Sequence, residues 1–140
     1  MEVSIVRQRL LQTIDRAKRS AADRRTRSDE ASRLYAGFLD RTAVPLVRQV
    51  AGVLKAEGLA YTVFTPAGSV RLMSDRSAED FIEIGLDTTG AEPRVMGHTS
   101  RRRGQRVLEH EQPIGVAVAD LTEDDLLEFL LKELEPFVER

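Results

Sequence analysis

Four arginines fall within six residues in the segment Arg101-Arg102-Arg103-Gly104-Gln105-Arg106, the densest group of chemically capable side chains in the sequence. Each guanidinium group donates hydrogen bonds in a planar fork that fits two oxygens of a phosphate or a carboxylate. Because the segment is also predicted to form a turn, it would present these forks together on a loop. The cluster indicates a receptor for phosphates, and nucleic acid is the obvious ligand.

A second basic group lies on the predicted N-terminal helix and would extend such a surface. Two features weigh against nucleic acid: aromatic residues for stacking bases make up only 5% of the chain, and the pI is near 5.8. The alternative is a solvated hairpin tip, or a tip that docks on the acidic C-terminal helix. The candidate residues for binding a partner or a phosphate are Arg101, Arg102, Arg103, Arg106, Arg24, Arg25 and Arg27.

The two histidines, His98 and His110, are the only imidazoles, and the chain contains no cysteine. On a strand, Glu109 and Glu111 would point to the opposite face from His110, so these three residues would not form one metal site. His98 has no carboxylate within three residues, whereas a metal site needs three or four ligands brought together. We therefore expect no metal ligand.

Acid–base catalysis would require two carboxylates held in a cleft, one of them with a raised pKa. Glu83 and Asp87, four residues apart on or near one predicted strand, share a face, which is equally typical of the polar side of a half-exposed sheet. No serine lies in a G-x-S-x-G motif, and no glycine-rich phosphate-binding loop occurs. The sequence predicts no catalytic residue and no cofactor.

The elements that would position these groups begin with a helical segment, since the first forty residues contain one glycine and no proline. Apolar residues recur there with alternating spacings of three and four, a pattern typical of helices that pack on helices. Two seven-residue series make this seam: Val3, Leu10, Ala17, Ala31 and Phe38 in one, and Ile14, Ala21 and Tyr35 in the other.

Arg24 and Ser28 interrupt the seam within a polar stretch from Asp23 to Glu30. Either one long helix crosses solvent there, or the chain turns and Ser28 caps a second helix. The absence of Gly and Pro from the stretch favours the long helix. Because so narrow an apolar stripe usually packs on a partner, we expect a homodimer formed through this helix.

A further helix is expected to begin at Thr42, which would cap it and leave Pro45 in the first turn, where the missing N–H costs little. Gly58 would end it in a left-handed conformation. The apolar period then becomes alternating, which predicts strands at 61–65 and 70–73 around a turn with Pro66 at its second position and Gly68 at its fourth. Further strands are expected at 81–86, near 95–96, at 106–111 and, as an optional sixth, at 114–118.

The last helix carries the strongest local signals. Thr122 is the expected N-cap, and Asp125 lies three residues later, where a capping-box acid belongs. Four leucines give the helix a broad apolar face that suits packing on the sheet, and Pro136 is expected to end it.

Charge is distributed unevenly along the chain. Residues 1–48 contain eleven Lys/Arg and six Asp/Glu, a net charge of +5. Residues 105–140 contain three Lys/Arg and ten Asp/Glu, a net charge of −7. Ends of opposite sign can attract each other within one chain or across a dimer, or each can meet a separate partner. With no apolar segment typical of a signal peptide or a membrane span, we expect a cytoplasmic protein and no membrane partner.

These observations predict a single α+β domain over residues 1–140. Residues 1–57 would be helical, 60–119 an antiparallel meander of four to six strands, and 122–135 a helix packed on the sheet. The leading functional expectation is a non-enzymatic, homodimeric protein-interaction or adaptor module of chaperone-like character. The alternatives are a nucleic-acid-binding or regulatory protein that uses the arginine turn and the basic helix, and a small-molecule-binding domain or enzyme.

Overall fold

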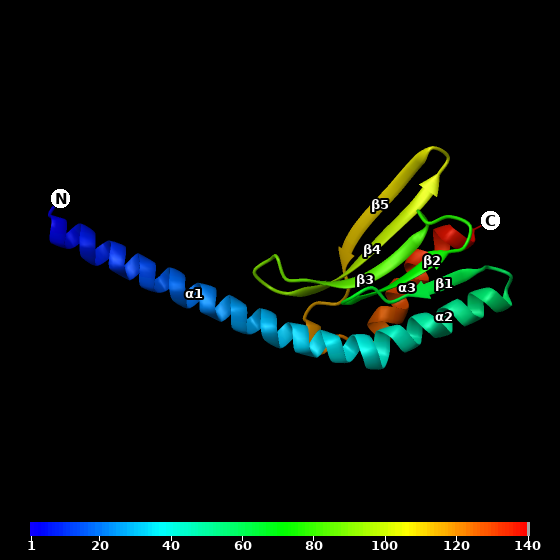
Figure 1. Ribbon diagram of the computed structural model, residues 1–140, viewed down its shortest axis with the longest axis horizontal. Helices are drawn as coiled ribbons and strands as arrows, with labels where there is room; N and C mark the ends of the chain where they lie inside the picture. The colour runs from blue at the N-terminus through cyan, green and yellow to red at the C-terminus, as the bar shows by residue number, and fades with distance from the viewer. Residues whose placement is uncertain (140) are drawn as a thin grey trace.

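The computed structural model describes residues 1–139 and has an α+β architecture (Figure 1). A long helix α1 (Val3–Phe38) and a second helix α2 (Val44–Ala56) precede a five-stranded antiparallel sheet, and α3 (Glu123–Val138) follows it. The predicted fold class is confirmed.

Helix α1 is continuous over 36 residues, a length of about 54 Å at 1.5 Å per residue. The polar stretch that interrupts the apolar seam is helical throughout, and Ser28 caps no second helix. Because this stretch contains neither Gly nor Pro, the backbone loses no donor there and no residue favours a turn. Of the two alternatives for this stretch, the long helix is therefore the one observed.

The junction between α1 and α2 corrects the prediction that Thr42 caps a new helix. The chain stays helical through a π-helical turn, η1 (Leu39–Ala43), and the Thr42 side chain makes no capping bond. Pro45 does lie in the first turn of α2, and Gly58 follows the helix with a φ of +82°. A wider turn ahead of Pro45 accommodates the missing N–H without a break in the helix, and the chain bends at this point (Figure 1).

The sheet is a meander in which each strand pairs antiparallel with the next along the chain. The connections are short and no helix intervenes, as the alternating pattern predicts. The strands are β1 (Tyr61–Phe64), β2 (Ser69–Ser74), β3 (Phe81–Asp87), β4 (Arg94–Arg103) and β5 (Arg106–Pro113).

Two connections differ from the prediction. In the β1–β2 turn the Ser69 N–H donates to the Pro66 carbonyl at 3.0 Å, so Pro66 is the first turn residue and Gly68 the third, where a φ of +79° requires glycine. The optional sixth strand is absent from the described residues. Gly115, with a φ of +67°, directs the chain away from the sheet into a short 3₁₀ turn, η2 (Val118–Asp120).

Helix α3 begins with the predicted capping box. The Asp125 N–H donates to the Thr122 hydroxyl at 3.1 Å, and the Thr122 N–H donates to the Asp125 carboxylate at 3.1 Å. The predicted end at residue 135 is wrong, because Pro136 lies inside the helix, which continues to Val138. So close to the C-terminus, the one backbone hydrogen bond that proline removes is too small a loss to end the helix.

The helices cover one face of the sheet, where α2 lies over β1 and β2 and α3 over β4. Side chains at alternate sheet positions, including Leu72 and Ile84, meet fully buried residues of α2 and α3 such as Val47 and Leu130. The remaining positions of the sheet form its second side, which no helix covers within the described residues and which we call the open face.

Gly97 in β4 lies directly beneath the ring of Phe129 in α3, and a Cβ at this position would overlap the ring. Gly97→Ala should therefore lower the free energy of unfolding by about 1–3 kcal/mol, measured by urea denaturation. Gly85→Ala is the matched control, because a Cβ there finds its nearest atom, the Ser69 Cβ, at 3.9 Å. Equal effects of the two substitutions would show that the contact with Phe129 does not limit the packing of α3.

Candidate interaction surfaces

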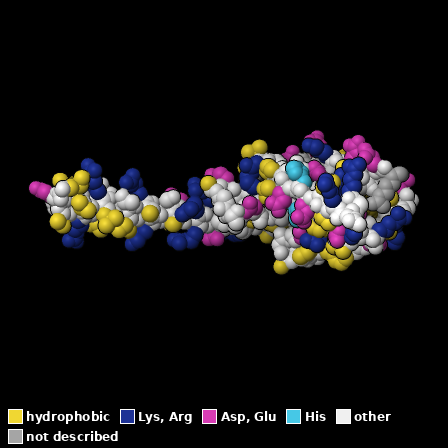
Figure 2. Space-filling model, turned by 90° about the horizontal axis from the view of Figure 1, so that it is seen from above, with side chains coloured by type: hydrophobic (Ala, Val, Ile, Leu, Met, Phe, Trp, Pro, Cys, Tyr) yellow, Lys and Arg dark blue, Asp and Glu magenta, His cyan; other side chains and the backbone are white. Residues whose placement is uncertain are grey.

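The first two thirds of α1 project away from the rest of the molecule (Figures 1 and 2). From Val3 to Arg27 every residue is exposed except Ala21, which is half-buried. We call this segment the arm and residues 28–139 the body. At 25 residues the arm is about 37 Å long. It contains eight Lys/Arg and two Asp/Glu, a net charge of +6.

One face of the arm is apolar. Val3 is 83% exposed, Leu10 57% and Ile14 40%. Further along α1, the same face packs on the body through Ala31 and Tyr35, which are buried. We call the part of this face that lies on the arm the apolar stripe: Val3, Val6, Leu10, Ile14, Ala17 and Ala21.

Tyr35 attaches α1 to the sheet. Its hydroxyl donates to the Gly68 carbonyl at 2.9 Å and lies 3.3 Å from the Ile84 carbonyl. Burial of the phenol, and secondarily the nearby negative charge of Glu83, raise the pKa of Tyr35 to about 12. The tyrosine therefore stays protonated, and able to donate, across the whole physiological pH range.

The hairpin arginines lie at the β4–β5 turn. The Arg102 side chain is held at the surface of the body, since it lies 3.5 Å from the Glu79 carboxylate and donates to the Gly104 carbonyl at 3.1 Å. Arg101 and Arg103 lie on the other face of the hairpin, where Arg103 pairs directly with Arg106 across the turn. Within residues 1–139, the guanidinium groups of Arg101, Arg103 and Arg106 make no ion pair or hydrogen bond.

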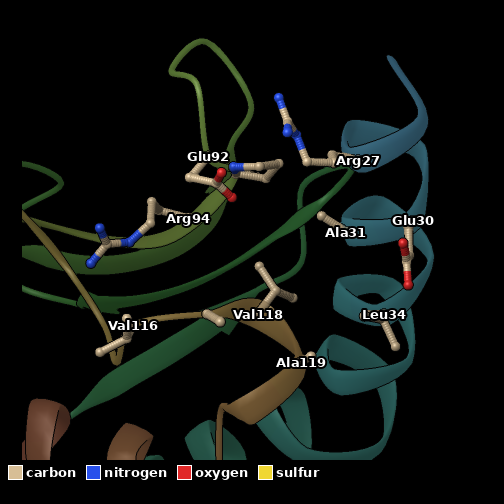
Figure 3. A pocket seen from close by; sticks show the side chains of 11 residues that line it. Arg27, Glu30, Ala31, Leu34, Glu92, Arg94, Val116, Val118 and Ala119 are labelled. Carbon is tan, nitrogen blue, oxygen red and sulfur yellow. The ribbon is translucent and has the colours of Figure 1, made fainter. Parts of the chain in front are cut away.

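The helical arginines lie elsewhere. Arg24 and Arg25 border a hollow of about 330 Å³ between α1 and the β3–β4 loop. Arg27 borders a neighbouring groove of about 420 Å³, in which Ala31 of α1 faces Val118 across the space (Figure 3). The hairpin tip lies far from both hollows (Figure 1). The seven candidate arginines therefore form two separate surfaces within one chain.

The open face brings together charged residues that the sequence left apart. Strand register places His98 between Glu83 and Glu111, and the His98 Nε2 lies 3.6 Å from the Glu109 carboxylate. As predicted, Glu109 and Glu111 point away from the side of His110. Glu83, Glu109 and Glu111 lie near His98 because of the register in which β3, β4 and β5 pair. That register cannot be read from the spacing of residues within one strand.

A hollow of about 390 Å³ on the open face includes Ser69, Glu83 and His98 among its lining residues. The two carboxylate oxygens of Glu83 are already engaged, one by the Ser69 hydroxyl at 2.9 Å and the other by Arg71 at 3.0 Å. Ser69 thus donates to a carboxylate and not to the histidine that would activate a nucleophile. Among the described residues, no group of His, Asp or Glu side chains has an arrangement that could hold a metal ion.

The chain matches no family model, no curated protein and no solved structure with which it was compared. Over the part of the chain that the structure describes, no helix has both the length and the apolar character needed to cross a bilayer.

Replacing Tyr35 by Phe should lower the free energy of unfolding by about 1–2 kcal/mol near neutral pH, because the Gly68 carbonyl would lose its buried donor. The difference should depend on pH. The pKa of Tyr35 is higher in the folded than in the unfolded state, so the protonated phenol contributes fully to the free energy of unfolding below pH 10. This contribution is lost as the pH rises from about 10 to about 12.

Urea denaturation of both proteins at pH 8 and pH 11 measures this difference. The gap in unfolding free energy between the wild type and Tyr35→Phe should narrow at the higher pH. A gap of equal size at both pH values would mean that the Tyr35 phenol ionises as it does in the unfolded chain.

Proposed function

We propose that the protein is a non-enzymatic, homodimeric protein-interaction module of adaptor or chaperone-like character, and that the arm forms its dimer contact. The observation that carries this proposal is the apolar stripe, whose valine, leucine and isoleucine side chains are exposed along a projecting helix. Burial of one such side chain contributes about 1.5–3 kcal/mol, so covering several of them on a second copy is strongly favourable.

The local stability of the arm also supports a partner. No side chain caps the start of α1, and no acidic residue lies in its first turn. The one ion pair along the arm joins Arg19 to Asp15, and both side chains are largely exposed, so the pair contributes little. Most helical stability in proteins comes from packing of an amphipathic face. A contact along the apolar stripe would supply that stability.

The proposal also includes binding of the homodimer to a further protein and a location in the cytoplasm. In a dimer, the hairpin tips and the open faces of two copies remain as surfaces for other proteins. A fold without disulfides, in a chain that has no cysteine, suits a reducing compartment.

The double substitution Leu10→Gln and Ile14→Gln should raise the dissociation constant of the dimer at least about 100-fold, because it removes two apolar side chains from each copy. Glutamine keeps a high helix propensity, so the helix itself is preserved. Analytical ultracentrifugation across micromolar concentrations measures the change.

The matched control is Val53→Gln with Val116→Gln, which removes two exposed apolar side chains from the body. These substitutions should leave the dimer nearly intact. A monomeric wild type at tens of micromolar, or equal effects of the two pairs, would contradict the proposal.

A second candidate function is nucleic-acid binding, and a specific observation favours it. Three arginines at the hairpin tip have no partner among residues 1–139, so their guanidinium groups are free to meet phosphates. The tip is narrow and exposed, a shape that can enter a groove.

If this second function holds, replacing Arg101, Arg103 and Arg106 by Ala should weaken oligonucleotide binding in fluorescence anisotropy. It should also flatten the dependence of affinity on salt by about one unit of slope for each lost contact. The matched control replaces Arg33, Arg48 and Arg76, which are exposed elsewhere, and gives the same net charge. No binding at low salt, or equal losses in the two triple variants, would exclude the hairpin tip as a nucleic-acid site.

A further inference from the structure

The outer face of α3 combines exposed apolar side chains with carboxylates. Leu131 is 59% exposed and Val138 is 38% exposed, although the opposite face of the same helix is buried in the core. Helical spacing places these two residues in one row with three exposed acids. We call this row the α3 ridge: Asp124, Glu128, Leu131, Glu135 and Val138.

The α3 ridge and the arm are opposite in charge and alike in having exposed apolar residues. Helix α3 contains six Asp/Glu and one Lys, a net charge of −5, against +6 on the arm. On the arm, Arg7 and Lys18 border the apolar stripe on one side and Arg9 lies on the other. Each surface therefore combines exposed apolar side chains with charges of the sign that the other lacks.

Within one chain these surfaces do not meet. The arm points away from the body, whereas α3 lies in the body between the sheet and the solvent (Figure 1). Because α1 is an unbroken helix fixed at its base by Ala31 and Tyr35, the arm has no hinge by which to fold back.

We propose that the arm of one copy packs on the α3 ridge of a second copy, and that the second arm packs reciprocally on the first. This inference rests on the proposed function, since it names the surface that receives the arm in the homodimer. The apolar stripe covers Leu131 and Val138, and the bordering Lys and Arg side chains meet Glu128 and Glu135. At about 37 Å the arm is long enough to cover α3, which is about 24 Å long.

Charge favours this arrangement over direct pairing of the two arms. Two arms laid side by side would place +6 against +6 along their whole length, and like charges at such distances oppose association. Contact between the arm and helix α3 joins +6 to −5. Exchange of arms about a two-fold axis uses both copies of each surface, so the assembly closes at two chains.

Two charge-reversed proteins test the inference. The first replaces Arg7, Arg9 and Lys18 by Glu on the arm, and the second replaces Glu128 and Glu135 by Lys on the α3 ridge. Each protein alone should be monomeric where the wild type is dimeric, because like charges then face each other at the substituted positions of both reciprocal contacts. An equimolar mixture should form a heterodimer, since one contact is restored with exchanged signs and the other is unchanged from the wild type.

Controls of equal net charge separate this effect from overall repulsion. Glu57→Lys with Glu92→Lys matches the reversed ridge in charge, lies on exposed residues elsewhere and should leave the dimer intact. Arg33, Arg48 and Arg76 replaced by Glu match the reversed arm in charge. This triple variant should remain dimeric alone.

An uncharged pair of variants provides an independent measurement. Leu131→Gln should raise the dissociation constant at least about 10-fold, whereas Val116→Gln, which alters a side chain 79% exposed elsewhere on the body, should leave it unchanged. Circular dichroism confirms that each variant is folded.

The outcomes distinguish the inference from the function on which it rests. A wild type that is monomeric at tens of micromolar overturns both. A dimeric wild type whose ridge-reversed variant is equally dimeric, and whose arm-reversed variant pairs preferentially with wild type, shows that the arms pair directly. That result overturns the inference alone. Monomeric single variants that associate when mixed support it.

Discussion

The base of α1 is held against the sheet by a short set of contacts on which the rest of the structure depends. Ala31, Tyr35 and Leu39 are buried, and the Tyr35 hydroxyl reaches the Gly68 carbonyl in the β1–β2 turn and the Ile84 carbonyl in the middle of β3. A helix is stiff over lengths of this order, so fixing its last third sets the direction of everything before it. The arm therefore leaves the body along one line and presents the apolar stripe in one orientation.

This geometry separates the charged surfaces of the molecule. The basic arm, the β4–β5 hairpin and helix α3 lie at separate places on the molecule (Figure 1). Attraction between the oppositely charged ends cannot be satisfied within one copy, because a rigid helix holds one of them away. Attraction across two copies remains available.

The open face of the sheet has a different character. Arg71 stacks 4.0 Å from the centre of the Phe81 ring, and it pairs with Glu83 on the next strand. His98 meets the same ring edge-on at a centroid distance of 5.3 Å. In these contacts the charged side chains of one strand interact with side chains of the neighbouring strand. Such cross-strand pairs are expected to stabilise a solvated sheet face.

Sequence by itself determined the elements. The unbroken α1, the capping box of α3 and the antiparallel meander all follow from patterns within a few residues, because helix periodicity, capping and strand alternation act over one or two turns. The π-helical turn before Pro45 and the continuation of α3 past Pro136 were missed. Proline removes a hydrogen bond in both places, but the wider turn before Pro45 and the position of Pro136 in the last turn of α3 make this loss too small to end a helix.

Only the tertiary structure decided what those elements present to solvent. The seam from Val3 to Phe38 has one period along its whole length, yet its first part is exposed and its last part is buried. Register between strands brought His98 beside Glu109, and chain direction placed the hairpin arginines far from those of α1. Local pattern records which face of an element is apolar. Contacts between residues distant in sequence decide which other element covers that face. These contacts cannot be read from the spacing of residues within one element.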